Sequence, residues 1–134
     1  MSEGRFSTAT RSEVALSVPA DSAYLTVVRT AAAGLGARLD FTLDDIEDLR
    51  IAVDEACALL LRQARPETAL DVSFSLGEAN LAVRVAATCD RPSIPSRSGF
   101  SWTVLAALTD ELDMEVDGSS LLITLSRSRG GADW

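Results

Sequence analysis

The chain of 134 residues contains no histidine and no lysine, and it has only two cysteines. Without histidine it cannot carry a Ser-His-Asp triad, a Cys-His pair or a histidine-ligated zinc ion, so any general base must be a carboxylate or a tyrosine. Without lysine it cannot carry a P-loop, whose lysine binds phosphate. Two cysteines are too few for a four-cysteine zinc site. We therefore predict no metal site.

Long apolar runs are also absent. Residues 1–12 are mostly small and polar, and no apolar stretch approaches the length of a membrane span. We expect a cytoplasmic protein with no membrane partner and with both thiols reduced. Cys57 and Cys89 are then small buried side chains. The alternative is a redox pair, which needs their Cα atoms within roughly 7 Å of each other.

Acidic residues exceed basic ones by 20 to 12, which gives a net charge of −8. Such a surface repels phosphate backbones, so we expect no direct binding to nucleic acid. It suits a basic protein partner. Four of the acids, Asp44, Asp45, Glu47 and Asp48, follow one another closely. They form either an ordinary charged helix face or a docking surface for a basic protein.

The length and the 47% apolar content indicate one globular domain with an aliphatic core, because aromatic residues make up only 5%. The first dozen residues lack periodicity and are rich in Ser, Thr and Gly. We predict a mobile N-terminal arm over residues 1–12, a domain over residues 13–127 and a flexible tail over residues 128–134.

Apolar residues alternate with polar ones in five segments and recur at helical spacing in three others. The predicted strands are 13–18, 69–76, 81–85, 112–116 and 121–125. The predicted helices run from about residue 21 to Gly34 or Gly36, from Thr42 to Arg62, and from Ser98 or Gly99 to Thr109. This β-α-α-β-β-α-β-β order predicts an α+β two-layer sandwich, with three helices on one face of a mostly antiparallel mixed sheet.

Two segments carry a recognisable pattern: the predicted helix Asp48-Leu-Arg-Ile-Ala-Val-Asp-Glu-Ala-Cys-Ala-Leu-Leu-Leu-Arg62 and, after it, Ser98-Gly-Phe-Ser-Trp-Thr-Val-Leu105. Together with the element order they resemble the anti-sigma factor (serine-protein kinase-like) family of the GHKL ATPase superfamily. The amino-acid sequences of both segments are similar to those of the actinobacterial branch of the family, which regulates sigma-F-type factors. The resemblance covers Val14 to Ser126 and implies the GHKL, or Bergerat-type, ATPase fold.

The resemblance also assigns positions in a nucleotide site. Glu55 falls at the position of the family's general base. Leu59 falls where the family has a magnesium-binding Asn, and a leucine offers no oxygen to magnesium. Asp90 falls where a family Asp recognises adenine, but Pro92 replaces the first glycine that follows it.

A second glycine-rich segment of the family aligns with the start of the last helix. Gly99 is the one glycine kept there, and Phe100 and Trp102 add bulk where phosphates need a close approach to the backbone. Both aromatic residues are either core residues or contacts for a protein partner.

The resemblance implies an anti-sigma factor that acts in transcription regulation, and these substitutions predict that its ATP site is degenerate. It would bind a sigma factor, be released by an anti-anti-sigma antagonist, and require no cofactor. Weak binding of ATP with magnesium stays open. Two alternatives remain: an active ATP-dependent serine kinase of the antagonist, and a nucleotide or second-messenger sensor that uses the remnant pocket. Exposed strand edges would permit a homodimer.

Overall fold

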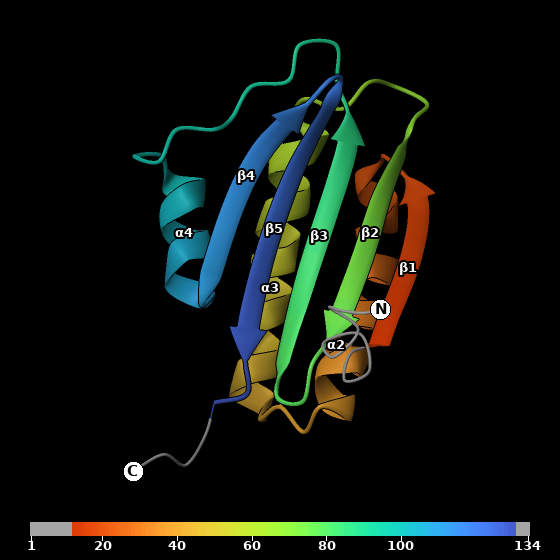
Figure 1. Cartoon of the computed structure of the whole chain (residues 1–134). Helices are drawn as coiled ribbons and strands as arrows, with labels where there is room; N and C mark the ends of the chain where they lie inside the picture. The colour runs from red at the N-terminus through yellow and green to blue at the C-terminus, as the bar shows by residue number, and fades with distance from the viewer. Residues whose placement is uncertain (1–11, 131–134) are drawn as a thin grey trace, which may run out of the picture.

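The computed structural model describes residues 12–130, and five of its segments form one sheet (Figure 1). Neighbouring strands lie in the order β1-β2-β3-β5-β4. Their bounds are Ser12–Pro19 for β1, Ala69–Leu76 for β2, Asn80–Thr88 for β3, Glu111–Asp117 for β4 and Ser120–Ser128 for β5. All five strands lie close to the predicted segments.

Every pairing between neighbouring strands is antiparallel, so the expectation of a partly parallel, mixed sheet is wrong. The reason lies in the connection from β1 to β2, which consists of two helices. The first helix carries the chain away from the end of β1 and the second brings it back. Pro19 at the end of β1 therefore pairs with Ala69 at the start of β2, and the two strands run in opposite directions.

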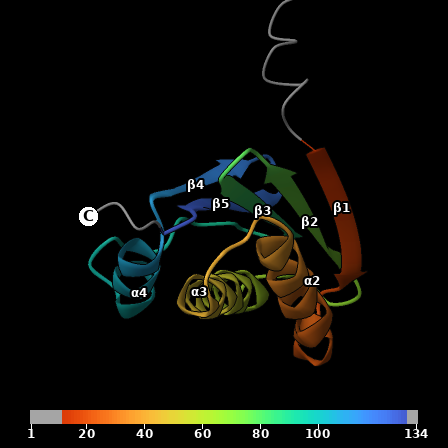
Figure 2. The same ribbon diagram turned by 90° about the horizontal axis from the view of Figure 1, so that it is seen from below.

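Three α-helices cover one face of the sheet, as predicted, and lie side by side beneath it (Figure 2). They are α2 (Leu25–Arg38), α3 (Leu43–Leu61) and α4 (Phe100–Leu108), with a short 3-10 helix, η1 (Ser22–Tyr24), before α2. The order of elements predicted from the sequence is confirmed. Within residues 12–130, the other face of the sheet carries no helix (Figure 1).

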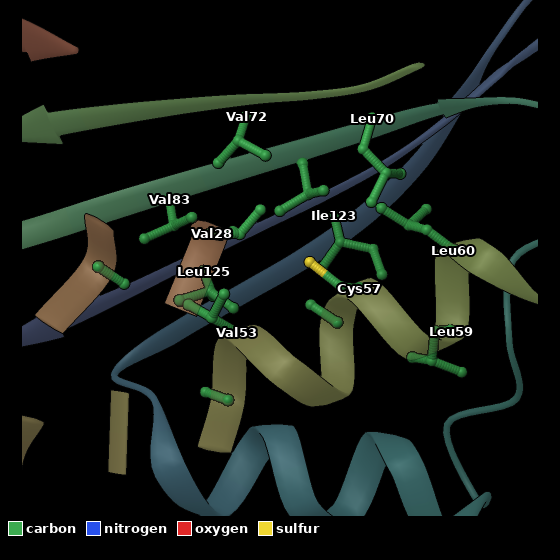
Figure 3. Close-up of a cluster of buried hydrophobic side chains, with 14 of the residues drawn as sticks. Val28, Val53, Cys57, Leu59, Leu60, Leu70, Val72, Val83, Ile123 and Leu125 are labelled. Atoms are coloured by element: carbon green, nitrogen blue, oxygen red, sulfur yellow. The ribbon is translucent and has the colours of Figure 1, made fainter. Parts of the chain in front are cut away.

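Helix α3 lies between the other two helices and supplies most of the helical core. Its start is fixed by Thr42, whose side-chain oxygen accepts a hydrogen bond from the Asp45 backbone N–H at 3.1 Å. Its buried side chains meet those of β2, β3 and β5 in an aliphatic core (Figure 3). The core includes Leu49, Val53, Ala56, Cys57, Leu60, Leu70, Val72, Val83, Ile123 and Leu125.

The end of α2 differs from the prediction, because the helix continues past Gly34 and Gly36 to Arg38. Asp40, with φ of 62°, provides the left-handed turn instead. Gly36 serves packing: a Cβ atom there would lie 3.4 Å from side-chain atoms of Ile46 and Phe41. The glycine thus lets α2 approach the start of α3 closely.

Hydrogen bonds join the chain to the domain as far as Gly130, whereas the predicted flexible tail begins at residue 128. Strand β5 continues to Ser128, and the Arg129 backbone N–H donates to the Ala79 carbonyl at 2.7 Å. The Gly130 N–H donates to Asp45 Oδ2 at 2.8 Å. Residues 128–130 of the predicted tail are therefore hydrogen-bonded to the domain, whereas 131–134 and arm residues 1–11 lie outside the described residues. Among the helices of residues 12–130, none combines the length and hydropathy that crossing a membrane requires.

Candidate functional site

Most of the residues that the sequence analysis assigns to a nucleotide site, but not Asp90, lie where α3 meets the start of α4. A hollow of about 270 Å³ lies between the two helices. Its walls come from α3 and from the loop and first turn of α4: Leu59, Arg62, Pro95, Ser96, Gly99, Phe100, Ser101 and Trp102. This volume is below the range of about 300–1,000 Å³ that is usual for small-molecule pockets.

Leu59 forms part of the wall of this hollow and is 5% exposed. Its side chain leaves α3 on the side that faces α4, whereas Leu60 points to the sheet (Figure 3). The position that the resemblance assigns to a magnesium ligand thus presents only apolar atoms. Among the described residues no group of three or more His, Cys, Asp or Glu side chains is placed to hold a metal ion.

Glu55 lies one turn before Leu59 and is joined to α4 by a short hydrogen bond. The Ser101 hydroxyl donates to Glu55 Oε2 at 2.5 Å. Ser101 is 8% exposed, so the bond is sheltered from water and links the two helices directly. Sequence reasoning quoted the segment that contains Ser101 but gave it no role. The spacing of residues in a helix predicts which of them share a face, but it does not predict which side chain of another helix they contact.

Asp90 is placed away from this group. Its side chain is 81% exposed and forms an ion pair with Arg65, whose Nε lies 3.1 Å from Oδ1. It follows directly after Cys89, which bridges to Ala64 just beyond α3. The structure therefore brings Gly99, Leu59 and Glu55 to one place, while Asp90 points to solvent and does not form part of the hollow's wall.

The loop between β3 and α4 is held by the side chains of the protein itself. Gln63 Nε2 donates to the Ser93 carbonyl, and the Ser93 N–H donates back to Gln63 Oε1, both at 2.9 Å. The Arg97 guanidinium lies 4.6 Å from the centre of the Trp102 ring, a cation–π distance. Trp102 is partly buried against the core, whereas Phe100 is 79% exposed.

The acidic segment at the start of α3 divides into two parts. Asp45 is 4% exposed and turned inward, where Arg127 Nη2 approaches Oδ1 at 2.8 Å. Burial by itself would raise the pKa of Asp45, but hydrogen bonds from Arg127, the Gly130 N–H and Thr42 outweigh it and lower the pKa. Asp45 is therefore a structural ion-pair partner, and its assignment to a docking surface is wrong because it is not accessible.

The other acids of this segment remain nearer the surface. Asp44 is exposed, Glu47 pairs with Arg50 at 3.0 Å, and Asp48 lies 3.1 Å from Arg127 Nη2. These three residues lie in the first turns of α3, at the opposite end of the helix from Leu59 and Arg62 in the wall of the hollow.

Both cysteines are free and buried. Burial, followed by the negative charge of Asp54, raises the pKa of Cys57 to about 12. Burial also raises the pKa of Cys89. Because the thiolate is the reactive form, both thiols are in an unreactive state at neutral pH.

A larger hollow, of about 480 Å³, lies on the helix-free face of the sheet. Its wall is made of Ala15, Leu16, Ser17, Asp71, Val72, Ser73, Arg84 and Ala86. No residue singled out by the sequence analysis is among them, so the candidate chemistry is concentrated at the smaller hollow.

Comparisons with known proteins agree with this geometry. A family model described as a histidine kinase-like ATPase domain matches residues 18–126. The anti-sigma-F factor RsbW of Mycobacterium tuberculosis H37Rv is 33% identical over 126 residues, which cover 89% of this chain and 75% of the relative. The serine-protein kinase RsbW of Bacillus anthracis is 34% identical over 76 residues, which cover 55% of this chain and 48% of the relative.

Solved structures show the same fold at lower identity. The crystal structure of the RsbU and RsbW domains of a Mycobacterium tuberculosis protein superposes with a TM-score of 0.70 at 16% identity. The match covers 87% of this chain, which spans about a third (32%) of that one. The Acinetobacter baumannii histidine kinase AdeS gives a TM-score of 0.52 at 13% identity, over 64% of this chain and 48% of its own.

Proposed function

Because this chain belongs to the family of histidine kinase-like ATPase domains, we propose that it works as an anti-sigma factor within that family. It binds an alternative sigma factor and is released from it by an anti-anti-sigma antagonist. The observation that carries the proposal is the 33% identity with an anti-sigma-F factor over 89% of the chain.

We further propose that the protein acts without phosphoryl transfer. Phosphoryl transfer depends on positioning and on metal ions that neutralise developing charge. Leu59, 5% exposed at the position of the magnesium ligand, supplies no oxygen. The residues present around the hollow do not fit a magnesium–nucleotide complex, and this mismatch supports a role in binding alone.

The Ser101–Glu55 hydrogen bond supports the same proposal. A general base must accept the proton of the attacking hydroxyl of the substrate. In this protein the Glu55 carboxylate already accepts a hydrogen bond from the hydroxyl of Ser101 inside the same chain. A substrate serine would have to displace this partly buried bond before Glu55 could act on it.

For the sigma factor we propose the acidic surface at the start of α3, defined by Asp44, Glu47 and Asp48. A net charge of −8 favours encounter with a basic region of the partner. Asp45 is left out of this surface because Arg127 and Gly130 engage it. Exposed charges are screened over about 10 Å at about 0.1 M salt, so the association rate should fall as salt rises.

The proposed binding is tested with purified protein and the sigma factors of the source genome. The expected result is a complex with one sigma factor in the absence of nucleotide, whose association slows as ionic strength rises. A triple variant, Asp44→Asn with Glu47→Gln and Asp48→Asn, should associate more slowly. A matched control, Asp71→Asn with Glu78→Gln and Asp113→Asn, removes three exposed charges elsewhere and should leave the rate nearly unchanged. The absence of any complex would contradict the proposal.

A second candidate is an active serine kinase of the antagonist. The observation in its favour is that the position of the general base keeps a carboxylate, Glu55, whose Oε2 is able to accept a hydrogen bond from a hydroxyl group. Incubation with labelled ATP, magnesium and the antagonist separates the two functions. Stoichiometric phosphoserine on the antagonist would establish the kinase, and an unlabelled antagonist is the result that the binding function predicts.

A further inference from the structure

Two arginines near the α3–α4 hollow lack an ion pair, whereas most other arginines of residues 12–130 that are named below form one. Arg29, Arg50, Arg65, Arg84 and Arg127 each form an ion pair with a carboxylate. Within residues 12–130 neither Arg62 nor Arg97 has such a partner; Arg62 forms part of the wall of the hollow and Arg97 stacks on Trp102. This end of an acidic protein therefore presents two positive charges that are not neutralised within the described chain.

Apolar side chains lie beside these charges. Phe100 is 79% exposed and Ile94 is 51% exposed. Phe100 is part of the wall of the hollow, and Leu59, Pro95 and Trp102 add apolar atoms to that wall. Large exposed apolar residues next to a concavity mark interaction sites more often than scattered single residues do.

The surface is held in place before any partner arrives. Gln63 anchors Ser93, one residue before Ile94, through two hydrogen bonds. Ser101, one residue after Phe100, is bonded to Glu55. A preformed surface loses less conformational entropy on binding than a flexible loop does.

We propose that Arg62, Ile94, Arg97, Phe100 and Trp102, named here the Arg62–Arg97 surface, form a docking site for an acidic segment of a protein partner. The segment inserts one large apolar side chain into the hollow, while its carboxylates meet the two arginines. This site differs in sign and in place from the acidic surface at the start of α3, so one protein can distinguish two partners by charge. The inference does not require the partner of the acidic surface to be a sigma factor.

The hollow suits this occupant because it is small and, within residues 12–130, no acidic cluster is placed to hold the metal ion of a nucleotide. At about 270 Å³ it is below the range of about 300–1,000 Å³ usual for small-molecule pockets. It is of the scale that receives a single anchoring side chain, as interface hot spots do. The charges around it attract carboxylates, Phe100 offers apolar contact at the wall of the hollow, and the exposed Ile94 offers it outside.

The test uses the full chain with Trp134→Phe, so that Trp102 is the only tryptophan and reports binding by fluorescence. The probe is a short synthetic peptide with one central Phe flanked by Asp and Glu. Three control peptides replace the Phe by Ala, the acids by Lys, or the acids by Asn and Gln. The expected result is saturable binding of the acidic Phe peptide, weaker binding of the Ala peptide, and no binding of the Lys peptide.

Variants of the protein locate the site. Arg62→Glu and Arg97→Glu should each weaken peptide binding about fivefold, because each reverses one exposed charge. Arg38→Glu makes the same charge change at the far end of α2 and should change the affinity less than twofold. Circular dichroism melting verifies that each variant is folded, since neither Arg62 nor Arg97 contributes an ion pair to the described fold.

Three outcomes would overturn the proposal. The first is equal binding of the acidic, amide and Lys peptides, which would show that charge does not select the partner. The second is equal effects of Arg38→Glu and Arg62→Glu, which would show a non-specific charge effect. The third is ATP, with or without magnesium, competing with the peptide and losing affinity on the same arginine substitutions, which would make the surface a nucleotide site.

Discussion

Replacing Leu59 by Asn restores the residue type that the resemblance places at the magnesium position, and the structure predicts that this harms the protein without restoring the function. Leu59 is 5% exposed and packs in the core cluster on the side of α4. An Asn there loses apolar packing and buries an amide. The buried hydroxyl of Ser101, which lines the same hollow, already donates to Glu55.

The loss of packing and the poorly satisfied amide together should lower the free energy of unfolding by about 3 kcal/mol. For a domain of this length that corresponds to a fall in melting temperature of about 10 °C. Ala58→Asn, on the same helix but only half-buried, is the control for helix propensity and should cost well under about 1 kcal/mol. Leu59→Met conserves volume and should cost less than about 1.5 kcal/mol.

The assay is thermal unfolding of the three variants with and without ATP and magnesium. We expect no nucleotide-dependent shift for Leu59→Asn, because the hollow stays small and bordered by Phe100 and Trp102. A variant of unchanged stability that gains a shift with ATP and magnesium would refute this reasoning. It would show that the hollow is open and that one oxygen ligand was all it lacked.

The remaining predictions concern the ion pairs, the thiols and the exposed aromatic residue. Arg127→Ala should lower the free energy of unfolding in urea by about 3–5 kcal/mol, because Asp45 stays buried without its partner. The pKa of Asp45 is lowered in the fold, so its carboxylate stabilises the protein above the pKa of the unfolded state, about 3.9, and this stabilisation is lost as the pH falls through the pKa of the folded state. Asp45→Asn should remove this contribution from the acid unfolding profile. Cys57 and Cys89 should resist a thiol reagent in the native protein at neutral pH and react after denaturation. Because the pKa of Cys57 is raised from 9.0 to about 12, the protonated thiol stabilises the fold fully below pH 9.0, and this stabilisation is lost as the pH rises toward about 12. Measured over the same pH range, the fall in the free energy of unfolding should be smaller in Cys57→Ala. Phe100→Ser should change stability by less than about 0.5 kcal/mol because the side chain is 79% exposed, so any effect on binding would be direct.

Much of this fold was predictable from local pattern. Period-two alternation in β2, with Leu70, Val72, Phe74 and Leu76 facing the helices, determines which face is buried. The helix cap at Thr42 was also predictable from local sequence, because it is a contact between Thr42 and Asp45, three positions apart.

Features that depend on contacts between distant segments were not predictable in this way. Gly36 looked like a helix end, but it is the contact point of α2 with Phe41 and Ile46, which only the packed structure brings together. Asp45 looked like one acid among four on a helix face. Its partner Arg127 lies 82 positions further along the chain. The Ser101–Glu55 bond spans 46 positions.

The candidate site shows the same division. The position of Leu59 beside Gly99 followed from the family resemblance, and the structure places both in the wall of one hollow. The resemblance could not tell that Asp90 turns out to Arg65, because that depends on the conformation of the loop after β3. It also could not tell that Gln63 holds this loop through Ser93.

The most direct test of the proposed function is transcription in vitro with core RNA polymerase and each sigma factor of the source genome. Purified protein is added with and without ATP and magnesium. The account predicts that transcription from one alternative sigma factor is inhibited, and to the same extent in both conditions. Inhibition that appears only with ATP and magnesium would contradict it, as would the failure to inhibit any sigma factor.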